Sequence, residues 1–227
     1  GHSYVVYDPL SDRLTTDLAP YIKEFNLRSE PSLIYFDNTK GAWIHIQGEG
    51  LYRIPPGSTR PLLLKDNSYT SSEITDIVST PNEALTIDNH GVLRIIAPES
   101  MLVAHTDSLI ARTSGRTTTF VYTIRTDSEG LAWIFSNEGL WLYDIRHRKW
   151  LNDLLPPDRN QKVVKAFLQD NSGTRWIARD HKGLEKVVRE DGRFRFIPVT
   201  TTEDPGISNT VTAIYEDDAE SLWIGTY

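Results

Sequence analysis

The chain has 227 residues, a formal net charge of −7 and 39% hydrophobic residues. Its length and hydrophobic content suit one large domain with a core, while its acidic balance argues against nucleic-acid binding, which requires a basic face. The chain contains no cysteine, which excludes disulfides, a thiol nucleophile and Cys-ligated zinc and suits a periplasm and a cytoplasm equally. All its apolar runs fall short of the roughly 18 residues that a membrane-spanning helix needs.

A spaced pair of Asp and Trp recurs along the chain. In each copy the Asp precedes the Trp by six residues, and a Gly-Leu pair follows the Trp in the first three copies. Self-similarity at a regular period indicates a repeat architecture. The four pairs are Asp37 and Trp43, Asp127 and Trp133, Asp170 and Trp176, and Asp217 and Trp223.

A fifth, degenerate copy lies between Trp43 and Trp133. In ITDIVSTPNEALTIDNHGVLRI (74–95), Leu85 takes the place of the Trp and Thr80 that of the Asp, and the turn is one residue shorter. The Trp-type positions 43, 85, 133, 176 and 223 are then 42 to 48 residues apart. The repeat unit is therefore roughly 40 to 50 residues long.

Each unit is predicted to contain four short strands. The chain begins with SYVVYD (3–8), which aligns with GLWLYD (139–144) and is expected to be the third strand of a unit. Asp and Gly favour a tight turn between the first two strands, because Asp bonds the nearby backbone and Gly tolerates positive φ. The strands of the first complete unit are SLIYF (32–36), WIHIQ (43–47), GLYRI (50–54) and PLLLK (61–65), all rich in β-formers.

Four strands in such a unit are the dimensions of a propeller blade, and no stretch shows sustained helical periodicity. We therefore predict an all-β chain, a β-propeller with four-stranded antiparallel blades and about five blade equivalents, four whole and two half. The two halves either join into a fifth blade or belong to a larger propeller; we expect the latter, because an open fragment leaves sheet edges that neighbours normally cover. The predicted ranges are 1–29 (outer strands of a preceding blade), 30–71, 72–116 (the degenerate blade), 117–161, 162–208 and 209–227 (inner strands of a further blade).

Three segments carry a resemblance to two-component regulator propeller repeats, which have the form I-x-x-D-x-x-G-x-x-W-I-G-T-x-x-G-L. They are TIRTDSEGLAWIFSNEGLWLYD (123–144), AFLQDNSGTRWIARDHKGLEKV (166–187) and AIYEDDAESLWIGTY (213–227). Only Trp223 is followed by the full Ile-Gly-Thr. The resemblance extends over nearly the whole chain, with the degenerate copy as its main departure.

The resemblance implies the extracytoplasmic sensor of a bacterial hybrid two-component histidine kinase. In that family the propellers are followed by an immunoglobulin-like module, a membrane span, a kinase of a phosphorelay and often a DNA-binding output. For this region it implies a periplasmic location as part of an inner-membrane protein and an oligosaccharide ligand. We also expect a homodimer in the full receptor, with no cofactor, no metal and no nucleic acid bound by this region.

The repeated residues are interpreted as structural. One Trp in each blade at a fixed strand position packs between sheets, where an aromatic side chain buries about 150–250 Å², and the Asp pins a turn. The residues given this role are Trp43, Trp133, Trp176, Trp223, Asp37, Asp127, Asp170 and Asp217.

Ligand contacts are expected in the loops that differ between blades, on the face formed by the 2–3 turns and the inter-blade connections. If the ligand is an acidic sugar, Arg and Lys side chains pair with it; if it is neutral, an aromatic ring and an amide carry the binding. The candidates are Arg112, Arg116, Arg179, His181 and Lys182 for the acidic ligand, and Tyr69 and Asn137 for the neutral one.

Two other functions stay open. A protein-interaction scaffold would need a broad apolar patch on one face. A carbohydrate-active enzyme would usually need two carboxylates a few ångström apart, and Asp76 is the nearest candidate for such a pair. Ser114, in TSG, does not fit a nucleophile elbow, and the six His residues lack metal-ligand spacing, so we expect this region not to be an enzyme.

Overall fold

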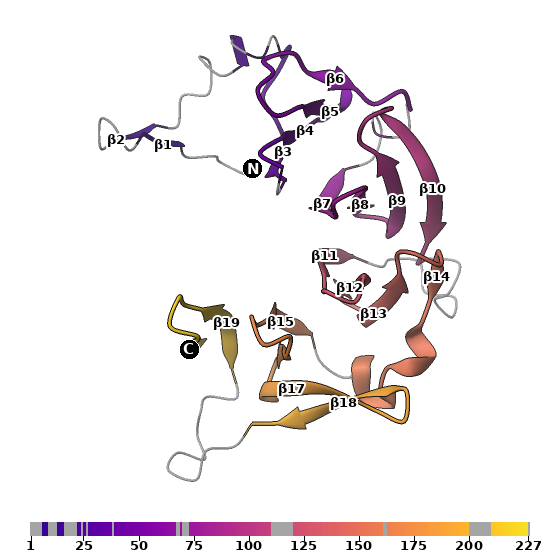
Figure 1. The fold of residues 1–227 in the computed structure, drawn as a ribbon, viewed down its shortest axis with the longest axis vertical. Coiled ribbons are helices and arrows are strands. Elements are labelled where there is room, and N and C mark those ends of the chain that lie inside the picture. The colour runs from indigo at the N-terminus through magenta and orange to yellow at the C-terminus, as the bar shows by residue number, and fades with distance from the viewer. Residues whose placement is uncertain are drawn as a thin grey trace. The chain divides into compact units, whose positions relative to one another are not determined.

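A computed structural model describes residues 6–8, 13–15, 22–23, 25, 27–37, 39–66, 69, 73–109, 120–160, 163–199 and 210–226 (Figure 1). The chain forms two compact units, Gly1–Thr113 and Ser114–Tyr227.

Within its described residues, the first unit contains one two-stranded and two four-stranded antiparallel sheets, in which each strand pairs with the next along the chain. The two-stranded sheet pairs β1 (Val6–Asp8) with β2 (Arg13–Thr15). Blade 1 consists of β3 (Leu33–Phe36), β4 (Ala42–Ile46), β5 (Gly50–Ile54) and β6 (Leu62–Leu63). Blade 2 consists of β7 (Ile74–Ser79), β8 (Ala84–Asp88), β9 (Val92–Ala97) and β10 (Leu102–Ser108).

The second unit repeats this architecture. Blade 3 consists of β11 (Val121–Thr126), β12 (Leu131–Ser136), β13 (Gly139–Asp144) and β14 (Lys149–Trp150). Two short 3-10 helices, η3 (Asn152–Leu154) and η4 (Pro157–Asn160), lead to blade 4, which consists of β15 (Val164–Gln169), β16 (Arg175–Arg179), β17 (Gly183–Glu190) and β18 (Arg193–Pro198). A final pair joins β19 (Val211–Glu216) to β20 (Leu222–Thr226).

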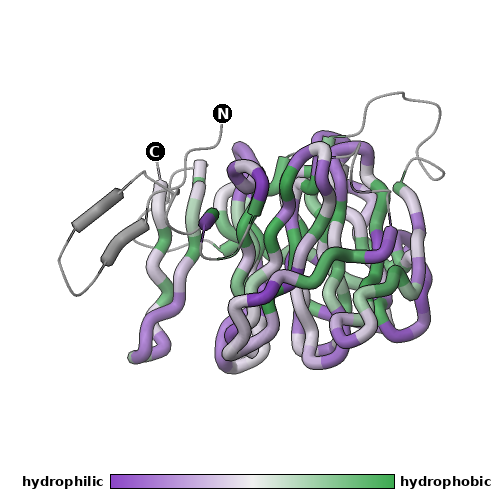
Figure 2. The backbone as a smooth tube through the Cα atoms, turned by 90° about the horizontal axis from the view of Figure 1, so that it is seen from above, coloured by the Kyte–Doolittle hydropathy of each residue, from purple (hydrophilic) through white to green (hydrophobic). Residues whose placement is uncertain are grey.

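Each blade is a four-stranded antiparallel meander, so the predicted all-β class is confirmed. Hydrophobic residues run along the strands and hydrophilic residues gather in the turns at the strand ends (Figure 2). The core lies between neighbouring blades of each unit. Trp43 of blade 1 clusters with Ile77 and Ile96 of blade 2, and Trp133 of blade 3 clusters with Phe194 of blade 4.

The repeated Asp and Trp form one connected element. The Asp127 carboxylate accepts hydrogen bonds from the backbone N–H groups of Glu129 (3.0 Å) and Leu131 (2.9 Å), and its second oxygen accepts one from Trp133 Nε1 (2.7 Å). The sequence predicted the turn and the packing residue, but not this bond between them. The same Trp to Asp bond is 3.3 Å long for Trp43 and Asp37, 2.8 Å for Trp176 and Asp170, and 2.7 Å for Trp223 and Asp217.

The four Trp residues differ in burial. Trp43 and Trp133 are fully buried, Trp176 is half-buried and Trp223 is 64% exposed. The hydrogen bond is therefore common to all four copies, while the packing contribution varies from copy to copy.

Blade 2 closes its first turn in a different way. The Thr80 hydroxyl accepts a hydrogen bond from the Glu83 N–H (3.1 Å), and the Thr80 N–H donates to the Glu83 carbonyl (2.8 Å). Leu85 fills the Trp position and is fully buried, but a leucine side chain offers no donor to the turn. The degenerate copy thus keeps the turn and the packing and loses the bond that joins them.

Candidate functional site

The two ends of each blade carry different turns. Because the strands are antiparallel, the turns between strands 1 and 2 and between strands 3 and 4 lie at one end, which we call the 1–2 end. The 2–3 turns and the connections between blades lie at the other end, which we call the 2–3 end. The sequence placed the ligand candidates at the 2–3 end.

Arg179 is buried at the 2–3 end of blade 4 and is only 1% exposed. Its guanidinium pairs with the buried Glu185 carboxylate at 2.5 Å and with the Asp158 carboxylate at 3.0 Å, and it donates to the Asp158 carbonyl at 2.9 Å. Burial alone would lower the pKa of Arg179, but the hydrogen bonds and charges of Glu185 and Asp158 raise it. The structure corrects the expected placement of Arg179 on an exposed turn: its donors tie helix η4 to the blade.

Tyr69 is fully buried in the connection between blades 1 and 2. Its hydroxyl lies 2.6 Å from Thr86 Oγ1, its carbonyl accepts a bond from His45 Nε2 (3.1 Å), and the Arg94 guanidinium lies 4.9 Å from its ring centroid. Burial raises the pKa of its hydroxyl. This ring is covered by protein, so the expected stacking of Tyr69 on a sugar does not fit its position.

The sequence analysis missed the ion pair beneath Tyr69. Arg94 Nη1 lies 2.9 Å from Asp88 Oδ2, and both side chains are buried. Asp88 Oδ1 also accepts from the N–H groups of His90 (3.0 Å) and Val92 (2.9 Å), the same i+2 and i+4 pattern that Asp127 makes. The Asp-x-x-Gly spacing of DNHG in the 2–3 turn was the available signal, because it matches DSEG and DNSG in the first turns of blades 3 and 4.

The remaining candidates at the 2–3 end are His181, Lys182 and Asn137. His181 and Lys182 are exposed in the 2–3 turn of blade 4. Asn137 Oδ1 accepts a hydrogen bond from the Phe120 N–H (2.8 Å), so this amide also fastens a turn. Arg112 and Arg116 lie outside the described residues.

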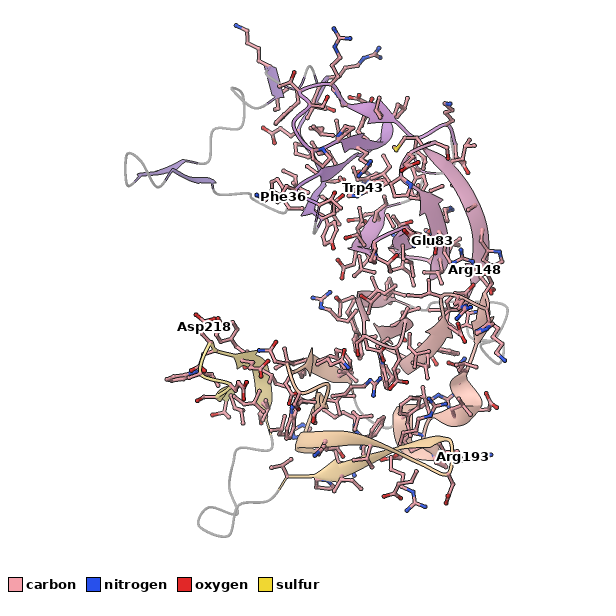
Figure 3. The ribbon with its side chains drawn as sticks, viewed as in Figure 1. Phe36, Trp43, Glu83, Arg148, Arg193 and Asp218 are labelled. Carbon is pink, nitrogen blue, oxygen red and sulfur yellow. The ribbon has the colours of Figure 1, made fainter. Side chains whose placement is uncertain are left out.

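A cleft of about 770 Å³ opens between blades 1 and 2 at the 1–2 end, where the sequence did not predict a site. Its walls include Asp37 and Arg53 of blade 1 and residues 79–84 and 97–100 of blade 2. Trp43 and Glu83, labelled in Figure 3, come from these two blades and contribute to the lining. The volume falls within the range of about 300–1,000 Å³ that is usual for small-molecule sites.

Arg53 is the positively charged residue of this cleft, and its contacts are incomplete. Its guanidinium lies 3.6 Å from the Asp37 carboxylate and 3.4 Å from the Pro98 carbonyl, and its buried Nε has no hydrogen-bond partner in the described structure. Hydrogen bonds from Thr39 and Gly41, with the charge of Arg53, lower the pKa of Asp37 although burial alone would raise it. A buried donor without a partner favours a ligand that accepts a hydrogen bond there.

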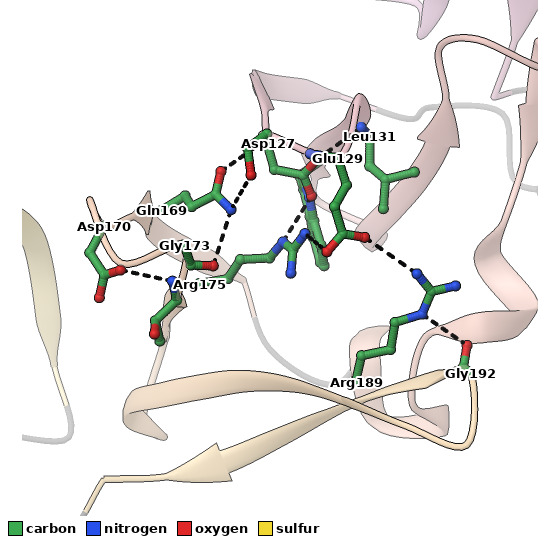
Figure 4. Close-up of polar contacts among 12 residues, drawn as sticks. Asp127, Glu129, Leu131, Gln169, Asp170, Gly173, Arg175, Arg189 and Gly192 are labelled. Carbon is green, nitrogen blue, oxygen red and sulfur yellow. Dashed lines mark hydrogen bonds and ion pairs between the residues drawn. The ribbon is translucent and has the colours of Figure 1, made fainter.

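In blades 3 and 4 an arginine side chain, Arg175, lies at the corresponding position and joins the two blades (Figure 4). Arg175 of β16 reaches back to blade 3, where its guanidinium pairs with Asp127 (2.8 Å) and Glu129 (2.7 Å) and lies 5.9 Å from the Trp133 ring centroid. Arg175 directly precedes the Trp-type position of its blade, and the residue that directly precedes it in blade 2 is Ala84. Blade 2 therefore has a methyl group at this position, which cannot reach Asp37 of blade 1 as Arg175 reaches Asp127 of blade 3.

The described residues contain no group of three or more His, Asp or Glu side chains arranged to hold a metal ion. Asp76, the candidate for a catalytic carboxylate pair, accepts a hydrogen bond from the Ile77 N–H (2.9 Å). Within the part of the chain that the structure describes, no helix is both long and apolar enough to cross a membrane.

Comparison with known proteins supports the repeat assignment. Residues 205–227 match the two component regulator propeller family, which confirms the resemblance for this copy. A search of curated proteins found no match.

Solved structures share the fold. The extracellular domain of BT4673 from B. thetaiotaomicron, assigned as a one component system, is 18% identical, with a TM-score of 0.58 over 87% of this chain and 27% of that chain. The extracellular domain of BT3049 from B. thetaiotaomicron, assigned as a hybrid two component system, is 15% identical, with a TM-score of 0.57 over 99% and 28%. The beta-propeller domain of Myceliophteria thermophila Cps50 (Swd1) is 11% identical, with a TM-score of 0.59 over 88% and 63%.

These similarities show a β-propeller fold, as the sequence predicted. The chain spans about a quarter of the length of the two B. thetaiotaomicron domains.

Proposed function

We propose that this region is the ligand-sensing propeller of a membrane-bound hybrid two-component sensor and that it binds an oligosaccharide outside the cytoplasm. The regulator-propeller match at 205–227 and the shared fold of the B. thetaiotaomicron extracellular domains support the sensor role. In this proposal the kinase lies elsewhere in the full protein, and the propeller region binds without catalysing a reaction.

The cleft between blades 1 and 2 carries the proposal of a sugar ligand. Arg53, Asn82 and Ser100 offer hydrogen-bond donors, and Glu83 and Glu99 offer acceptors. A sugar hydroxyl both donates and accepts, so it can use both kinds of group. Three prolines, Pro56, Pro81 and Pro98, make rigid apolar parts of the wall.

The formal charges of the cleft favour a neutral sugar over an acidic one. Asp37, Glu83 and Glu99 carry three negative charges, and Arg53 carries one positive charge. A carboxylate or sulfate on the ligand would meet this excess of like charge, which disfavours binding. Binding at this cleft should therefore depend little on salt.

Signalling requires that the ligand bind the resting and signalling states with different affinity. The cleft is formed by two separate blades, so a ligand that contacts both would favour one spacing of blades 1 and 2 over others. This is the means by which binding could be transmitted in the proposed sensor.

Calorimetry on the full extracytoplasmic region, with a panel of neutral and uronic-acid oligosaccharides, tests the proposal. Arg53→Ala should weaken binding of a neutral ligand at least tenfold, and Arg60→Ala, which removes an exposed arginine of the same blade outside the cleft lining, should leave it unchanged. Ala84→Arg should also abolish binding, because it places a guanidinium in the cleft at the position from which Arg175 reaches Asp127 in the other pair of blades. A ligand that binds all three variants as tightly as the wild type would show that the cleft is not its site.

A further inference from the structure

Two exposed aromatic side chains stand at the start of blade 3, at its 2–3 end. Phe120, directly before β11, is 57% exposed, and Tyr122, the second residue of β11, is 48% exposed. Val121 between them is buried. Because successive side chains of a strand point to opposite sides, and residues two apart are separated by about 7 Å, the two rings are neighbours on one exposed surface of the second unit.

Asn137 fastens Phe120 with two hydrogen bonds. The Asn137 N–H donates to the Phe120 carbonyl at 3.0 Å, and the Phe120 N–H donates to Asn137 Oδ1 at 2.8 Å. The first bond recurs in blade 2, where the Asn89 N–H donates to the Glu73 carbonyl at 3.0 Å. There, however, the Oδ1 atom of Asn89 is buried without a hydrogen-bond partner in the described structure. The backbone bond thus belongs to the fold, while blade 3 adds a side-chain bond that holds Phe120 in place.

Other sheets carry different residues at the two aromatic positions. The corresponding pairs are Glu73 and Thr75 in blade 2, Val163 and Lys165 in blade 4, and Thr210 and Thr212 in the final pair of strands. The same strand geometry therefore forms without aromatic rings, so the fold does not require Phe120 and Tyr122. Exposed positions that vary on a shared scaffold are where binding residues are commonly found.

The size of this surface suits a small ligand. An aromatic side chain offers about 150–250 Å², and about half of each ring is accessible, so the two expose about 200 Å² together. A stable protein interface buries about 800 Å² on each partner, which is far more. A pyranose ring has faces made of C–H groups, which pack on aromatic rings, and a rim of hydroxyl groups. The Tyr122 phenol and the carboxylate of Glu138, in the adjoining 2–3 turn, are polar groups that such hydroxyls can use.

We propose that Phe120 and Tyr122 form a platform on which a pyranose ring stacks, and that Asn137 positions Phe120 for this contact. The inference rests on the proposed function for the class of ligand, but none of these three residues lines the cleft between blades 1 and 2. The sequence assigned sugar stacking to Tyr69, which is buried; in this proposal the exposed rings of blade 3 have that role.

Titration of the full chain with methyl β-glucopyranoside, followed by amide chemical shifts, tests the platform. The ring C–H groups of this sugar point toward its two faces, whereas sorbitol has similar hydroxyl groups and no ring and is the control ligand. Saturable shifts are expected at residues 120–122 with the glucoside and not with sorbitol. Phe120→Ala and Tyr122→Ala should each raise the dissociation constant about fivefold. Tyr215→Ala, which removes an equally exposed aromatic of β19, is the matched control and should have no effect.

The positioning role of Asn137 is tested through Phe120. Asn137→Ala should weaken binding of the glucoside, and Asn137→Asp, which keeps an oxygen acceptor for the Phe120 N–H, should restore it. In the Phe120→Ala background, Asn137→Ala should cause no further loss. A further loss there would show that Asn137 does not act by holding Phe120.

Arg53→Ala separates this site from the proposed function. It alters the cleft of the first unit and should leave the shifts at residues 120–122 unchanged, so the platform can fail while the cleft binds sugar, and the reverse. The platform is overturned if the glucoside gives no saturable shifts at these residues, if sorbitol gives the same shifts, or if both ring variants bind as the wild type does. Shifts at residues 120–122 that change on dilution without sugar would identify a second copy of the chain as the occupant and would also overturn it.

Discussion

Replacing Trp133 and Trp223 by alanine separates the two contributions of the repeated Trp. Both residues belong to the second unit and both donate to an Asp at 2.7 Å. They differ in burial, because Trp133 is fully buried and Trp223 is 64% exposed. The hydrogen bond lost is the same in both variants, so the difference in unfolding free energy measures packing.

The expected magnitudes follow from these exposures. A fully buried aromatic covers about 150–250 Å², which at about 25 cal/mol per Å² corresponds to about 4–6 kcal/mol, and measured losses for Trp→Ala are about 3–5 kcal/mol. Trp133 also packs on Phe167 (centroids 5.3 Å apart) and Phe194 (5.1 Å). We expect Trp133→Ala to cost about 3–5 kcal/mol and Trp223→Ala about 1–2 kcal/mol, since only about a third of its surface is covered.

Urea denaturation followed by far-ultraviolet circular dichroism measures both variants, because removing a Trp changes the fluorescence signal itself. Asp127 keeps its bonds from Arg175, Glu129 and Leu131 after Trp133 is removed, so an unsatisfied carboxylate adds little to the loss. If Trp223→Ala proves as costly as Trp133→Ala, the Trp to Asp bond and not burial stabilises the blade, and the packing argument fails.

Three further measurements test other parts of the structure. Arg179→Ala should cost about 3–5 kcal/mol in the same denaturation assay, because it leaves the buried Glu185 carboxylate unpaired; a loss below 1 kcal/mol would show that the pair is not structural. Burial lowers the pKa of His45 below its ordinary value of 6.5, although its bond to Tyr69 and the charge of Glu73 act in the opposite direction. As the pH falls, His45 is therefore protonated at a higher pH in the unfolded chain than in the folded one. Stability should therefore be full above pH 6.5 and decrease below it by at most about 1.4 kcal/mol for each pH unit, and His45→Gln should remove this slope, whereas an unchanged slope would assign it to other groups. Incubation with a glycan panel should release no reducing ends or unsaturated products, and turnover that co-purifies with the protein would instead favour a carbohydrate-active enzyme.

Spacing alone determined the blade architecture. Six residues from Asp to Trp and the following Gly-Leu place a tight turn between two strands, and these distances are local enough to be visible in one sequence. The four-stranded sheets follow from this pattern, because short β-forming segments separated by turns can pair with their neighbours in the chain. The degenerate copy was also visible, since its period is preserved although Thr80 and Leu85 replace the motif residues.

The candidate site depended on contacts that the spacing does not contain. Arg179 and Tyr69 stand in loops when the sequence is considered alone, yet Glu185 and Asp158 draw the first into the interior and Thr86 and Arg94 surround the second. A charged or aromatic residue in a turn has the same local signature whether it faces solvent or protein. Whether such a residue is buried depends on the side chains that surround it, and these come from other strands and loops.

The cleft between blades 1 and 2 shows most clearly which features the sequence predicts and which depend on the tertiary structure. The sequence contains Ala84 and Arg175 at equivalent places of two repeats, so the substitution was visible. The packing of one blade on the next decides what these two residues do. Arg175 reaches Asp127 and Glu129 of the preceding blade, whereas Ala84 lines an open cleft. Local sequence determines each blade because its turns and strands are formed by near neighbours, while the spaces between blades are formed by side chains about 40 or more residues apart in the chain and are fixed only by the tertiary structure.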